Sequence, residues 1–421
     1  MSKNEREGLY SPVINWEKCR ACALCFETCP GYSVDFRSLN NEIFAKEPQD
    51  ILLGNHLACY VGHSREAEIR YHSSSGGLVT ELLIFSLENG LIDGALVTKM
   101  NENNPFEPEP FIARTRKEII SAAGSKYCPV PANIKLEQIL SEEGKFAVVG
   151  LPCHIQGIRK AAMIKRQLQE KIILHLGLFC SHTVDFRGTK LLLRKLGVDE
   201  KNIRKIDYRG RGWPGGLSLE LKTGNKKFIP LEDYYMFKYF LFSPPRCSVC
   251  SDPTAELADI SFGDAWLREM SREKIGKSIL VSRSKIGEEI LHNAQSEGKI
   301  EILKVDPDKV VRSQREIIFL KKKCLATNVM ISRIFHRHIP RYGQRTFRNT
   351  FHTDWVAVLV HLNLFISSDA RVPAFKSLFN RIPLKTIIAF NKYLCMFVSA
   401  VSLLMENSHF LEHQNEYRVA R

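Results

Sequence analysis

Four cysteines near the amino terminus are spaced closely enough to bind one inorganic centre. They form the pattern Cys19-x-x-Cys22-x-x-Cys25-x-x-x-Cys29-Pro30. Two-residue gaps let a tight loop present three thiolates to neighbouring corners of a cuboidal cluster, and the following helical turn presents the fourth. This spacing is typical of a bacterial ferredoxin 4Fe-4S site, whereas zinc sites usually combine two separate C-x-x-C pairs. The sequence therefore predicts a 4Fe-4S cluster here, with Cys29 closing that cluster or reaching to another.

A second set of four cysteines is spread along the middle of the chain. Cys153 and Cys180 each stand just after a short apolar run that is typical of a buried strand, and Cys247 forms a C-x-x-C pair with Cys250. Because ligand sites in open parallel sheets lie at the carboxyl ends of the strands, both single thiols should face one crevice. Together with the pair they complete a four-thiolate shell for a second cluster. The alternative is that Cys153 and Cys180 are ordinary buried thiols.

Three small polar segments could contact an organic cofactor. Ser73-Ser-Ser-Gly-Gly77 stands immediately before a helix expected from Leu78, where serine can cap the helix and free N–H groups favour a phosphate. The other two are Gly124-Ser-Lys-Tyr127 and Phe262-Gly-Asp-Ala-Trp266. Each segment alone is equally consistent with an ordinary turn, so the spacing does not decide its role.

The elements that must position these residues have the pattern of an α/β domain. Apolar runs at residues 95–98, 146–149 and 172–179 have the length of buried parallel strands, and residues 78–87 have helical periodicity. Residues 217–221 alternate between apolar and polar, which predicts a strand with one face in water. We therefore expect an α/β core, with a mixed or mostly parallel sheet and flanking helices.

The composition is that of a folded protein and excludes a disordered, collagen-like or polytopic membrane chain. Of 421 residues, 44% are hydrophobic and 25% are charged. The formal net charge is +14, but 19 basic and only 9 acidic residues lie from residue 301 onward. The basicity therefore belongs to the carboxyl-terminal part. Since that part has no recognised nucleic-acid motif, we expect no nucleic-acid partner.

Three units follow from these patterns. Residues 1–40 are expected to form a small ferredoxin-like module, residues 55–300 the cofactor- and cluster-binding core, and residues 301–421 a basic, mainly helical extension. The first residues lack the apolar stretch of a signal peptide, which predicts a cytoplasmic location. In such a reducing compartment, clustered cysteines are metal ligands more often than disulfides.

The extension begins with residues 321–348, which contain eight basic residues and no acidic one. A solvated helix face is the simplest interpretation, and docking of an acidic electron carrier such as ferredoxin or flavodoxin is the alternative. Residues 387–404 are apolar, but the charge-free part, 393–405, has 13 residues and is too short to span a bilayer. We expect packing on the core or another subunit, with a peripheral membrane contact less favoured.

Seven segments occur in a characteristic order along the chain: 73–77, 123–127, 150–153, 176–180, 208–215, 247–252 and 256–266. Through them the chain resembles the coenzyme F420 hydrogenase/dehydrogenase beta-subunit family of iron–sulfur flavoproteins. Many relatives carry a two-cluster ferredoxin module where this chain has a single run, and the basic extension matches nothing in the family pattern. The resemblance covers residues from about 70 to 285 together with the ferredoxin run.

The resemblance implies a noncovalent FAD beside a 4Fe-4S cluster of the core. Cys153, Cys180, Cys247 and Cys250 would bind that cluster, so that the chain would hold two 4Fe-4S clusters in all. The cofactor-binding residues that it implies are Ser74, Ser75, Gly76, Gly77, Gly124, Ser125, Lys126, Tyr127, Gly263, Asp264 and Trp266.

Together these features predict an oxidoreductase. It would pass electrons from a one-electron donor such as ferredoxin through the clusters to FAD and on to a small two-electron substrate, or in the reverse direction. Lys126, Tyr127 and His154 are weak candidates for proton delivery, and we assign no catalytic acid. One alternative is a non-catalytic electron-transfer subunit of a larger redox complex, and a second is a zinc-stabilised basic binding protein. No residue identifies the substrate.

Overall fold

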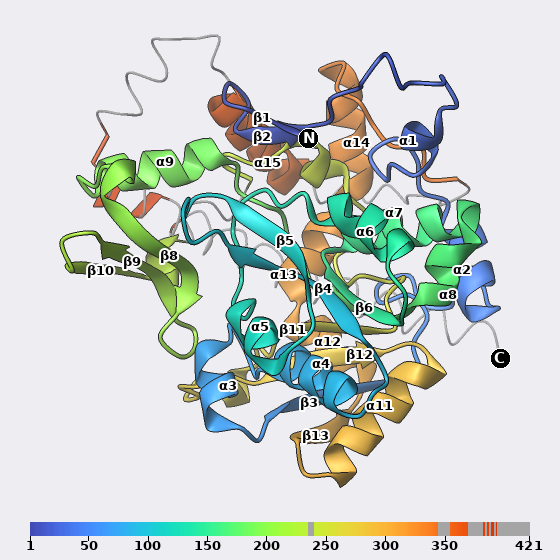
Figure 1. The fold of residues 1–421 in the computed structure, drawn as a ribbon. Helices are drawn as coiled ribbons and strands as arrows, with labels where there is room; N and C mark the ends of the chain where they lie inside the picture. The colour runs from blue at the N-terminus through green and yellow to red at the C-terminus, as the bar shows by residue number, and fades with distance from the viewer. Residues whose placement is uncertain are drawn as a thin grey trace, which may run out of the picture.

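The computed structural model of the chain describes residues 1–234, 240–343 and 354–368, with scattered positions between 382 and 393. Within these residues, one sheet of eight strands forms the centre, in the order β13-β3-β12-β11-β7-β6-β4-β5 (Figure 1). Its strands are β3 (Ala58–Ser64), β4 (Gly94–Met100), β5 (Pro108–Ala113), β6 (Phe146–Gly150), β7 (Ile172–Leu178), β11 (Ile260–Asp264), β12 (Ser278–Ser282) and β13 (Ile300–Val305).

The α/β core predicted from the sequence is confirmed, and its sheet is mixed. β4, β6, β7 and β11 pair in parallel at the centre, while the remaining pairings are antiparallel. The apolar runs at 95–98 and 146–149 lie within β4 and β6, and the run at 172–179 forms β7 and the residue after it. The edge strand β13 begins at residue 300 and continues to 305, so the sheet crosses the boundary expected there.

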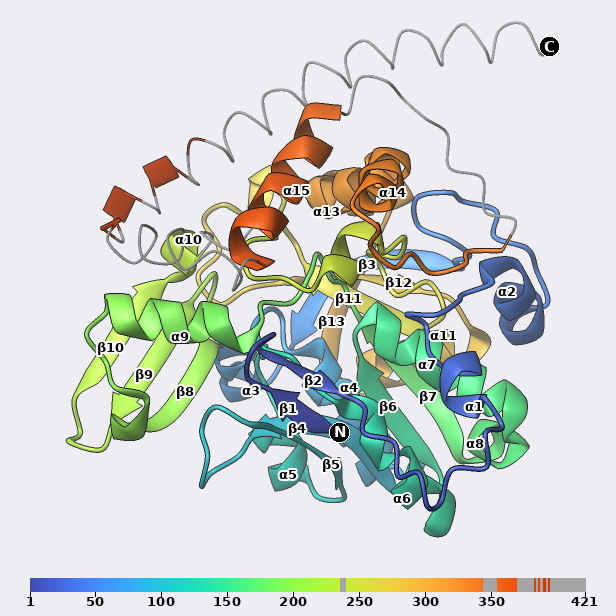
Figure 2. The same ribbon diagram turned by 90° about the horizontal axis from the view of Figure 1, so that it is seen from above.

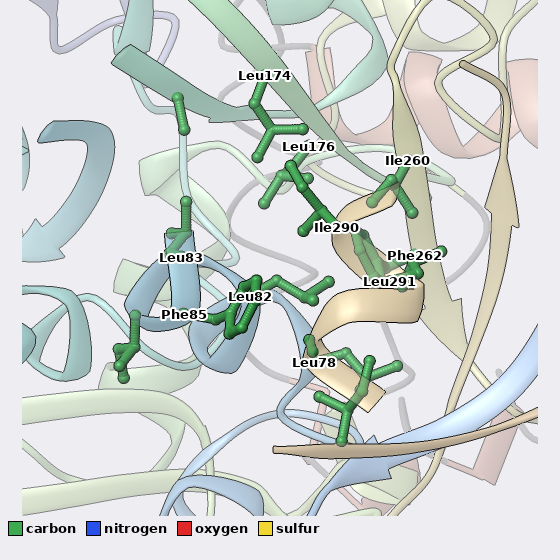
Figure 3. Packing of buried hydrophobic residues seen from close by; sticks show 14 of the residues in the cluster. Leu78, Leu82, Leu83, Phe85, Leu174, Leu176, Ile260, Phe262, Ile290 and Leu291 are labelled. Atoms are coloured by element: carbon green, nitrogen blue, oxygen red, sulfur yellow. The ribbon is translucent and has the colours of Figure 1, made fainter. Parts of the chain in front are cut away.

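Helices cover both faces of this sheet because successive strand residues point to opposite sides. On one face, α4 (Leu78–Glu88) and α11 (Lys285–Ser296) pack on β7 and β11 through Leu82, Leu176, Ile260 and Leu291 (Figure 3). α3 (Ala67–His72) and α5 (Arg116–Ser121) lie beside α4. The opposite face carries α6 (Leu136–Ser141), α7 (Pro152–Ile164) and α8 (Arg166–Lys171). The sheet is therefore buried on both sides, as the apolar runs predicted.

A second, smaller sheet stands beside the first. β8 (Ile203–Gly210), β9 (Gly216–Leu221) and β10 (Lys226–Pro230) are antiparallel, and α9 (Phe186–Lys195) packs on them (Figure 2). The alternating segment 217–221 is thus a strand, as predicted, but it belongs to this small sheet. α10 (Leu231–Tyr234) and the 3-10 helices η2 (Glu200–Asn202) and η4 (Pro245–Val249) flank it in the chain.

The two ends of the described chain meet on one side of the core. The first residues form β1 (Ser2–Asn4), β2 (Leu9–Ser11), α1 (Leu24–Glu27) and α2 (Phe36–Phe44). After β13 come α12 (Pro307–Ser313), α13 (Arg315–Ile318), the π-helical turn η6 (Phe319–Lys323), α14 (Leu325–Ile334) and α15 (Asp354–Ser368). The backbone N–H of Val34 donates to the Arg341 carbonyl at 2.7 Å, and that of Arg341 donates to the Tyr32 carbonyl at 3.0 Å. The extension therefore binds the amino-terminal segment directly.

Among the helices described, none is long and apolar enough to cross a membrane. The helix expected at residues 387–404 lies almost entirely outside the described residues, so its packing stays a prediction.

Candidate functional site

The spread-out cysteines converge at one edge of the central sheet. Cys153 lies in the first turn of α7, directly after β6, and Cys180 lies just past the end of β7, where its N–H donates to the Pro253 carbonyl at 2.9 Å. β6 and β7 are parallel neighbours, so both cysteines lie at the carboxyl ends of these strands, where open parallel sheets bind ligands. Cys247 lies on η4, and Cys250 follows it.

Three of these thiols, those of Cys153, Cys180 and Cys247, are close enough to other members of the set for the charge of those members to affect their ionisation. Burial raises the pKa of Cys180 to about 12; the Lys321 ammonium opposes this rise, and negative charge on each of the other three thiols adds to it. Burial likewise raises the pKa of Cys153 to about 11, against the Arg246 guanidinium. Four thiolates in this space therefore need a cationic centre among them to be deprotonated together. This requirement is the one that a metal cluster meets.

Two cations border the thiols, the buried Lys321 and the half-buried Arg246. The Lys321 side chain is only 2% exposed, and its Nζ lies 3.4 Å from Cys250 Sγ. Burial lowers the pKa of Lys321, but the thiols beside it outweigh that effect and leave the pKa above its ordinary value. The pKa of Arg246 is likewise raised by Cys153 and Cys250 in spite of burial. The interpretation of residues 321–348 as a solvated face is therefore wrong for Lys321, because the helical turn that carries it packs inward.

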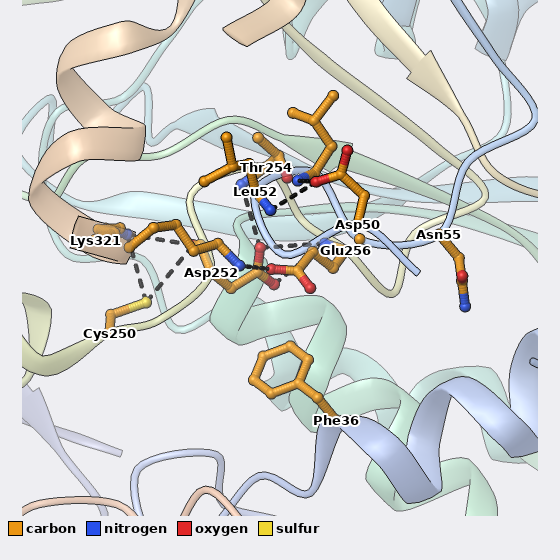
Figure 4. A network of polar contacts seen from close by, with 12 residues as sticks. Phe36, Asp50, Leu52, Asn55, Cys250, Asp252, Thr254, Glu256 and Lys321 are labelled. Atoms are coloured by element: carbon orange, nitrogen blue, oxygen red, sulfur yellow. Dashed lines mark hydrogen bonds and ion pairs between the residues drawn. The ribbon is translucent and has the colours of Figure 1, made fainter. Parts of the chain in front are cut away.

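A buried network of charges continues from Lys321 (Figure 4). Gln156 Nε2 donates to Asp252 Oδ2 at 2.9 Å, and Lys322 forms an ion pair with the fully buried Glu256. The Arg283 guanidinium donates to the carbonyl oxygens of Leu53, Asn55 and Thr254. These contacts fix the loop that follows the C-x-x-C pair, so the positions of its thiols are held by the core.

Within the described residues, no three His, Cys, Asp or Glu side chains converge closely enough to hold a single metal ion. A 4Fe-4S cluster makes a different demand, because its four thiolates bind four iron atoms at separate corners of a cube. The shared edge, the mutual effect on pKa and the two cations are the observations that fit such a cluster.

The amino-terminal cysteines lie in a different environment. Cys19, Cys22, Cys25 and Cys29 are all exposed. The loop between them uses left-handed backbone at Ala21 (φ 52°) and Ala23 (φ 58°), and α1 follows with Cys25 in it. These four residues remain predicted ligands.

The amino-terminal run nevertheless packs near the core set. Lys160 of α7 donates from Nζ to the Ser33 carbonyl at 2.5 Å and to the Cys29 carbonyl at 3.4 Å. Gly31 lies between Arg246 and Cys29: a Cβ there would lie 3.2 Å from Arg246 Nε and 3.3 Å from Cys29 Sγ. Arg246, which acts on Cys153, therefore also borders Cys29.

The three polar segments proposed for an organic cofactor form one continuous surface. The Ser125 N–H donates to Ser74 Oγ at 2.6 Å, which joins the first segment to the second. The Gly76 N–H donates to Ser278 Oγ at 3.0 Å, and Ser278 pairs with Asp264 across β11 and β12, which joins the first segment to the third. Residues far apart in sequence thus meet at one site.

Asp264 is the centre of this surface. Arg209 donates to both of its carboxylate oxygens, at 2.7 and 2.8 Å, and Trp213 Nε1 donates to Oδ1 at 2.8 Å. Arg209 also reaches the Tyr127 hydroxyl at 3.3 Å. The Trp213 and Trp266 rings lie 4.8 Å apart, and Trp266 is 38% exposed, so one aromatic ring faces outward. Neither Arg209 nor Trp213 was predicted as a site residue, although the segment 208–215 that contains them carried part of the resemblance.

The glycines of these segments serve packing more than ligand approach. A Cβ at Gly76 would lie 2.6 Å from the Gly62 carbonyl oxygen, and one at Gly263 would collide with the Phe179 ring. Gly124 (φ +83°) is different, because its nearest neighbour for a Cβ is Asp207 Oδ1 at 3.8 Å, which leaves room. The Phe179–Gly263 contact also places the chain just before Cys180 against the Asp264 segment.

Of the three candidates for proton delivery, Tyr127 contacts Arg209 through its hydroxyl, and the contacts of Lys126 and His154 do not place them for chemistry. Lys126 Nζ donates to the carbonyls of Ala122, Ala123 and Gly124, and burial lowers its pKa to about 8 against the charge of Asp207. His154 Nδ1 accepts the Leu151 N–H at 3.3 Å, and burial lowers the pKa of His154 to about 4. Both side chains fix local backbone, so we still assign no catalytic acid.

Known proteins share this core. Profiles of the coenzyme F420 hydrogenase/dehydrogenase beta subunit match residues 59–136 with the amino-terminal part and 143–308 with the carboxyl-terminal part. The coenzyme F420 hydrogenase subunit beta of Methanothermobacter thermautotrophicus is 30% identical over 243 residues, 55% of this chain and 82% of that protein. The coenzyme F420-dependent sulfite reductase of Methanocaldococcus jannaschii is 27% identical over 352 residues, 74% of this chain and 52% of that protein.

A solved structure has a similar fold. A chain of the F420-reducing NiFe hydrogenase complex from Methanosarcina barkeri aligns with a TM-score of 0.55 and 25% identity, over 69% of this chain and 98% of that one. The matched profiles include all four core cysteines. The amino-terminal cysteine run and Lys321 lie outside them.

Proposed function

The chain belongs to the coenzyme F420 hydrogenase/dehydrogenase beta-subunit family, and we propose that it is an iron–sulfur flavoprotein oxidoreductase. In this proposal it moves electrons between a one-electron donor and an unidentified two-electron substrate, using two 4Fe-4S clusters and FAD. A redox role is supported by the relatives, which are named as a hydrogenase subunit and a sulfite reductase.

The convergence of the four core cysteines carries the proposal. Three separate elements bring them to one sheet edge, where Lys321 and Arg246 supply positive charge. A cluster held by four thiolates is negatively charged, and burying such a charge is costly unless cations offset it. The residues present therefore fit a 4Fe-4S cluster on Cys153, Cys180, Cys247 and Cys250.

The surface around Asp264 is the proposed site of FAD. A flavin exchanges two electrons as a hydride and also one at a time, whereas a 4Fe-4S cluster carries one electron, so the pair can join the two kinds of chemistry. In this chain Trp266 offers the exposed aromatic face, and Arg209 with Trp213 holds the Asp264 segment in place. Ser74, fixed by Ser125, and Gly124, with open space beside it, would complete the contacts.

Coenzyme F420 itself is the second candidate for this surface. The names of the relatives favour it, since both the hydrogenase subunit and the sulfite reductase are named for that coenzyme. It is a deazaflavin with a flat ring like that of a flavin, so the same aromatic face would serve either molecule. The extracted cofactor distinguishes the two.

The exposed amino-terminal run is proposed to bind the second cluster and to exchange electrons with a redox partner. Because all four cysteines are exposed, a cluster bound to them would lie at the surface, where a partner could approach it. The Methanothermobacter thermautotrophicus relative is named as a subunit, and the solved relative is part of a complex, which favours a partner subunit. Ferredoxin or flavodoxin is the alternative donor.

Anaerobic purification of the full chain tests the composition. We expect about eight iron and eight sulfide per chain, as two 4Fe-4S clusters require, with one FAD released by acid. Four iron would show that one cysteine set binds no cluster. A colourless protein with zinc would overturn the proposal, and deazaflavin fluorescence in place of FAD would favour the second candidate.

A second experiment separates an enzyme from an electron-transfer subunit. The purified chain is mixed with reduced ferredoxin and with oxidised coenzyme F420, and the reduction of the coenzyme is followed by its absorbance. Turnover by the chain alone supports an enzyme that uses this coenzyme as its substrate. Reduction of the bound cofactor without turnover of any acceptor tested would instead support a subunit that needs its partner.

A further inference from the structure

The extension covers the core cysteines with residues that lie outside both matched profiles. α13, η6 and α14 follow one another along the chain, and η6 contacts η4, which carries Cys247. Phe319 and Leu320 of η6 pack with Phe240 and Val356 in a buried apolar cluster that Cys247 borders. This packing turns the following residue, Lys321, toward the cysteines.

Lys321 points directly at a predicted cluster ligand (Figure 4). Its Nζ lies 3.4 Å from Cys250 Sγ and 3.4 Å from the Asp252 carbonyl oxygen, and its side chain is almost fully buried. The hydrogen bond therefore joins a full positive charge to the sulfur in surroundings where water does not screen it. Such a charge acts more strongly than one at the surface.

The nearby carboxylates have other partners. Glu256 pairs with Lys322, and the Asp252 side chain accepts from Gln156 and from the N–H groups of Thr254 and Glu256. Lys321 approaches Asp252 only through the backbone oxygen among the contacts described. The ammonium is thus directed at the sulfur of Cys250 rather than at a carboxylate.

We infer that Lys321 is a positioning residue that raises the reduction potential of the core cluster through the Cys250 sulfur. This inference rests on the proposed function, because it takes Cys250 as a ligand. Reduction is the uptake of one electron by the cluster, with no bond made or broken, and it adds one negative charge. A hydrogen bond and a buried positive charge at a ligand sulfur stabilise the reduced state more than the oxidised state. A residue of the extension thereby sets the reduction potential of the cluster that the core cysteines bind.

Redox titration with dithionite, followed by EPR of the full chain, tests the inference. We expect Lys321→Met to lower the equilibrium constant for reduction of the core cluster at least tenfold, a shift of about 59 mV to more negative potential. Lys321→Gln keeps a neutral donor and should give a smaller shift in the same direction. Lys323→Met, which removes an exposed lysine of the same turn, should leave the potential unchanged. The signal of the amino-terminal cluster should not move in any variant.

The outcomes separate this inference from the proposed function. A wild-type chain that holds no core cluster would overturn the proposed function itself. A wild-type chain with its core cluster, and Lys321→Met with full iron content and an unshifted potential, would overturn only the role of Lys321. If Lys321→Met loses the core cluster, the reduction potential is compared in Lys321→Gln and Lys321→Arg instead. Loss of the cluster in both neutral variants with retention in Lys321→Arg would show a role in assembly and overturn the inference about potential.

Discussion

The two cysteine sets of this chain are opposite in construction. The amino-terminal set lies within eleven residues, and all its thiols are exposed. The core set is assembled from the ends of two strands and a separate C-x-x-C pair, with Cys250 buried and the other three partly buried. Lys321 and Arg246 stand beside the core set. A local run can bind a cluster at the surface, whereas a buried site needs the tertiary fold to supply both ligands and charge.

This contrast suggests different tasks for the two sets. An exposed cluster can meet a partner, while a partly buried cluster between that surface and the Asp264 segment can pass electrons inward. Arg246 borders both sets, and Phe179 joins the core set to the Asp264 segment. The core set therefore lies between the amino-terminal set and the Asp264 segment.

Removing one predicted ligand from each set gives the largest expected effect. It tests whether the two cysteine sets bind separate clusters. Cys247→Ser should lose about half of the iron and the core cluster's EPR signal, because three thiolates leave one iron without its ligand. Cys22→Ser should lose the other half and leave the core signal. Iron assays with EPR of both variants are the measurement. A single substitution that removed all iron would show that the two sets do not bind separate clusters.

Cys29→Ser tests whether Cys29 binds the cluster of its own run or the core cluster. Cys29 is exposed like the other three cysteines of its run, so we expect this variant to match Cys22→Ser in iron content and EPR signal. Loss of the core signal instead would mean that Cys29 serves the core cluster.

The proposed cofactor surface around Asp264 depends on the ion pair of Asp264 with the buried Arg209, and breaking this pair has the next largest expected effect. Asp264→Asn leaves the Arg209 guanidinium, whose side chain is 3% exposed, without its carboxylate. We expect the free energy of unfolding to fall by about 3 kcal/mol and the cofactor to be lost on gel filtration. Urea unfolding and the cofactor content measure both effects.

The exposed pair of Glu220 with Arg204 is the matched control, since Arg204 is 65% exposed. Glu220→Gln should change the free energy of unfolding by less than about 1 kcal/mol. Equal decreases in the free energy of unfolding of Asp264→Asn and Glu220→Gln would contradict the prediction that the buried pair contributes more to stability than the exposed one.

Acid should lower the stability of the core by protonating a buried histidine. The amino-terminal segment lacks such a group, because residues 1–40 contain no histidine. Burial lowers the pKa of His175 to about 4, with Arg159 adding to this and Asp259 opposing it. The unfolded chain binds this proton near pH 6.5, so the stability is complete above that pH and falls as the pH drops toward 4. From His175 alone we expect the free energy of unfolding to fall by about 2 kcal/mol between pH 7 and pH 5.

Urea unfolding of wild type and His175→Gln at both pH values checks this sign. On acidification from pH 7 to pH 5, the free energy of unfolding of the variant should fall by about 2 kcal/mol less than that of the wild type. An identical loss in the two proteins would mean that His175 is not the group that titrates.

The smallest effect concerns the link between the extension and the C-x-x-C pair. The Tyr342 hydroxyl donates to the Val249 carbonyl, between Cys247 and Cys250. Tyr342→Phe leaves that buried carbonyl unpaired and should lower the free energy of unfolding by about 1 kcal/mol. Tyr71→Phe, at a position 43% exposed, should have almost no effect on it. Thermal unfolding of the two variants is the comparison, and equal midpoints would argue against the link.

The fold was predictable where one local pattern has one structural meaning. Apolar runs of strand length became β4, β6 and β7, and the helical periodicity before Asn89 became α4. Lys321 was misjudged because a lysine-rich helical run looks the same in sequence whether it faces water or a buried site. Arg209 and Trp213 were missed because their partner, Asp264, lies more than fifty residues away, and no local spacing records that contact.

The sequence by itself determined the four-cysteine run and the buried strands, since both depend on neighbours along the chain. Spacing within eleven residues is limited by covalent geometry, and burial of a strand on both faces requires a continuous apolar segment. Only the tertiary structure decided which distant groups meet. Pairing of β6 with β7 brings Cys153 toward Cys180, and the packing of Phe319 and Leu320 turns a surface-like lysine onto Cys250. These contacts depend on how the sheet and the extension pack, which no single segment specifies.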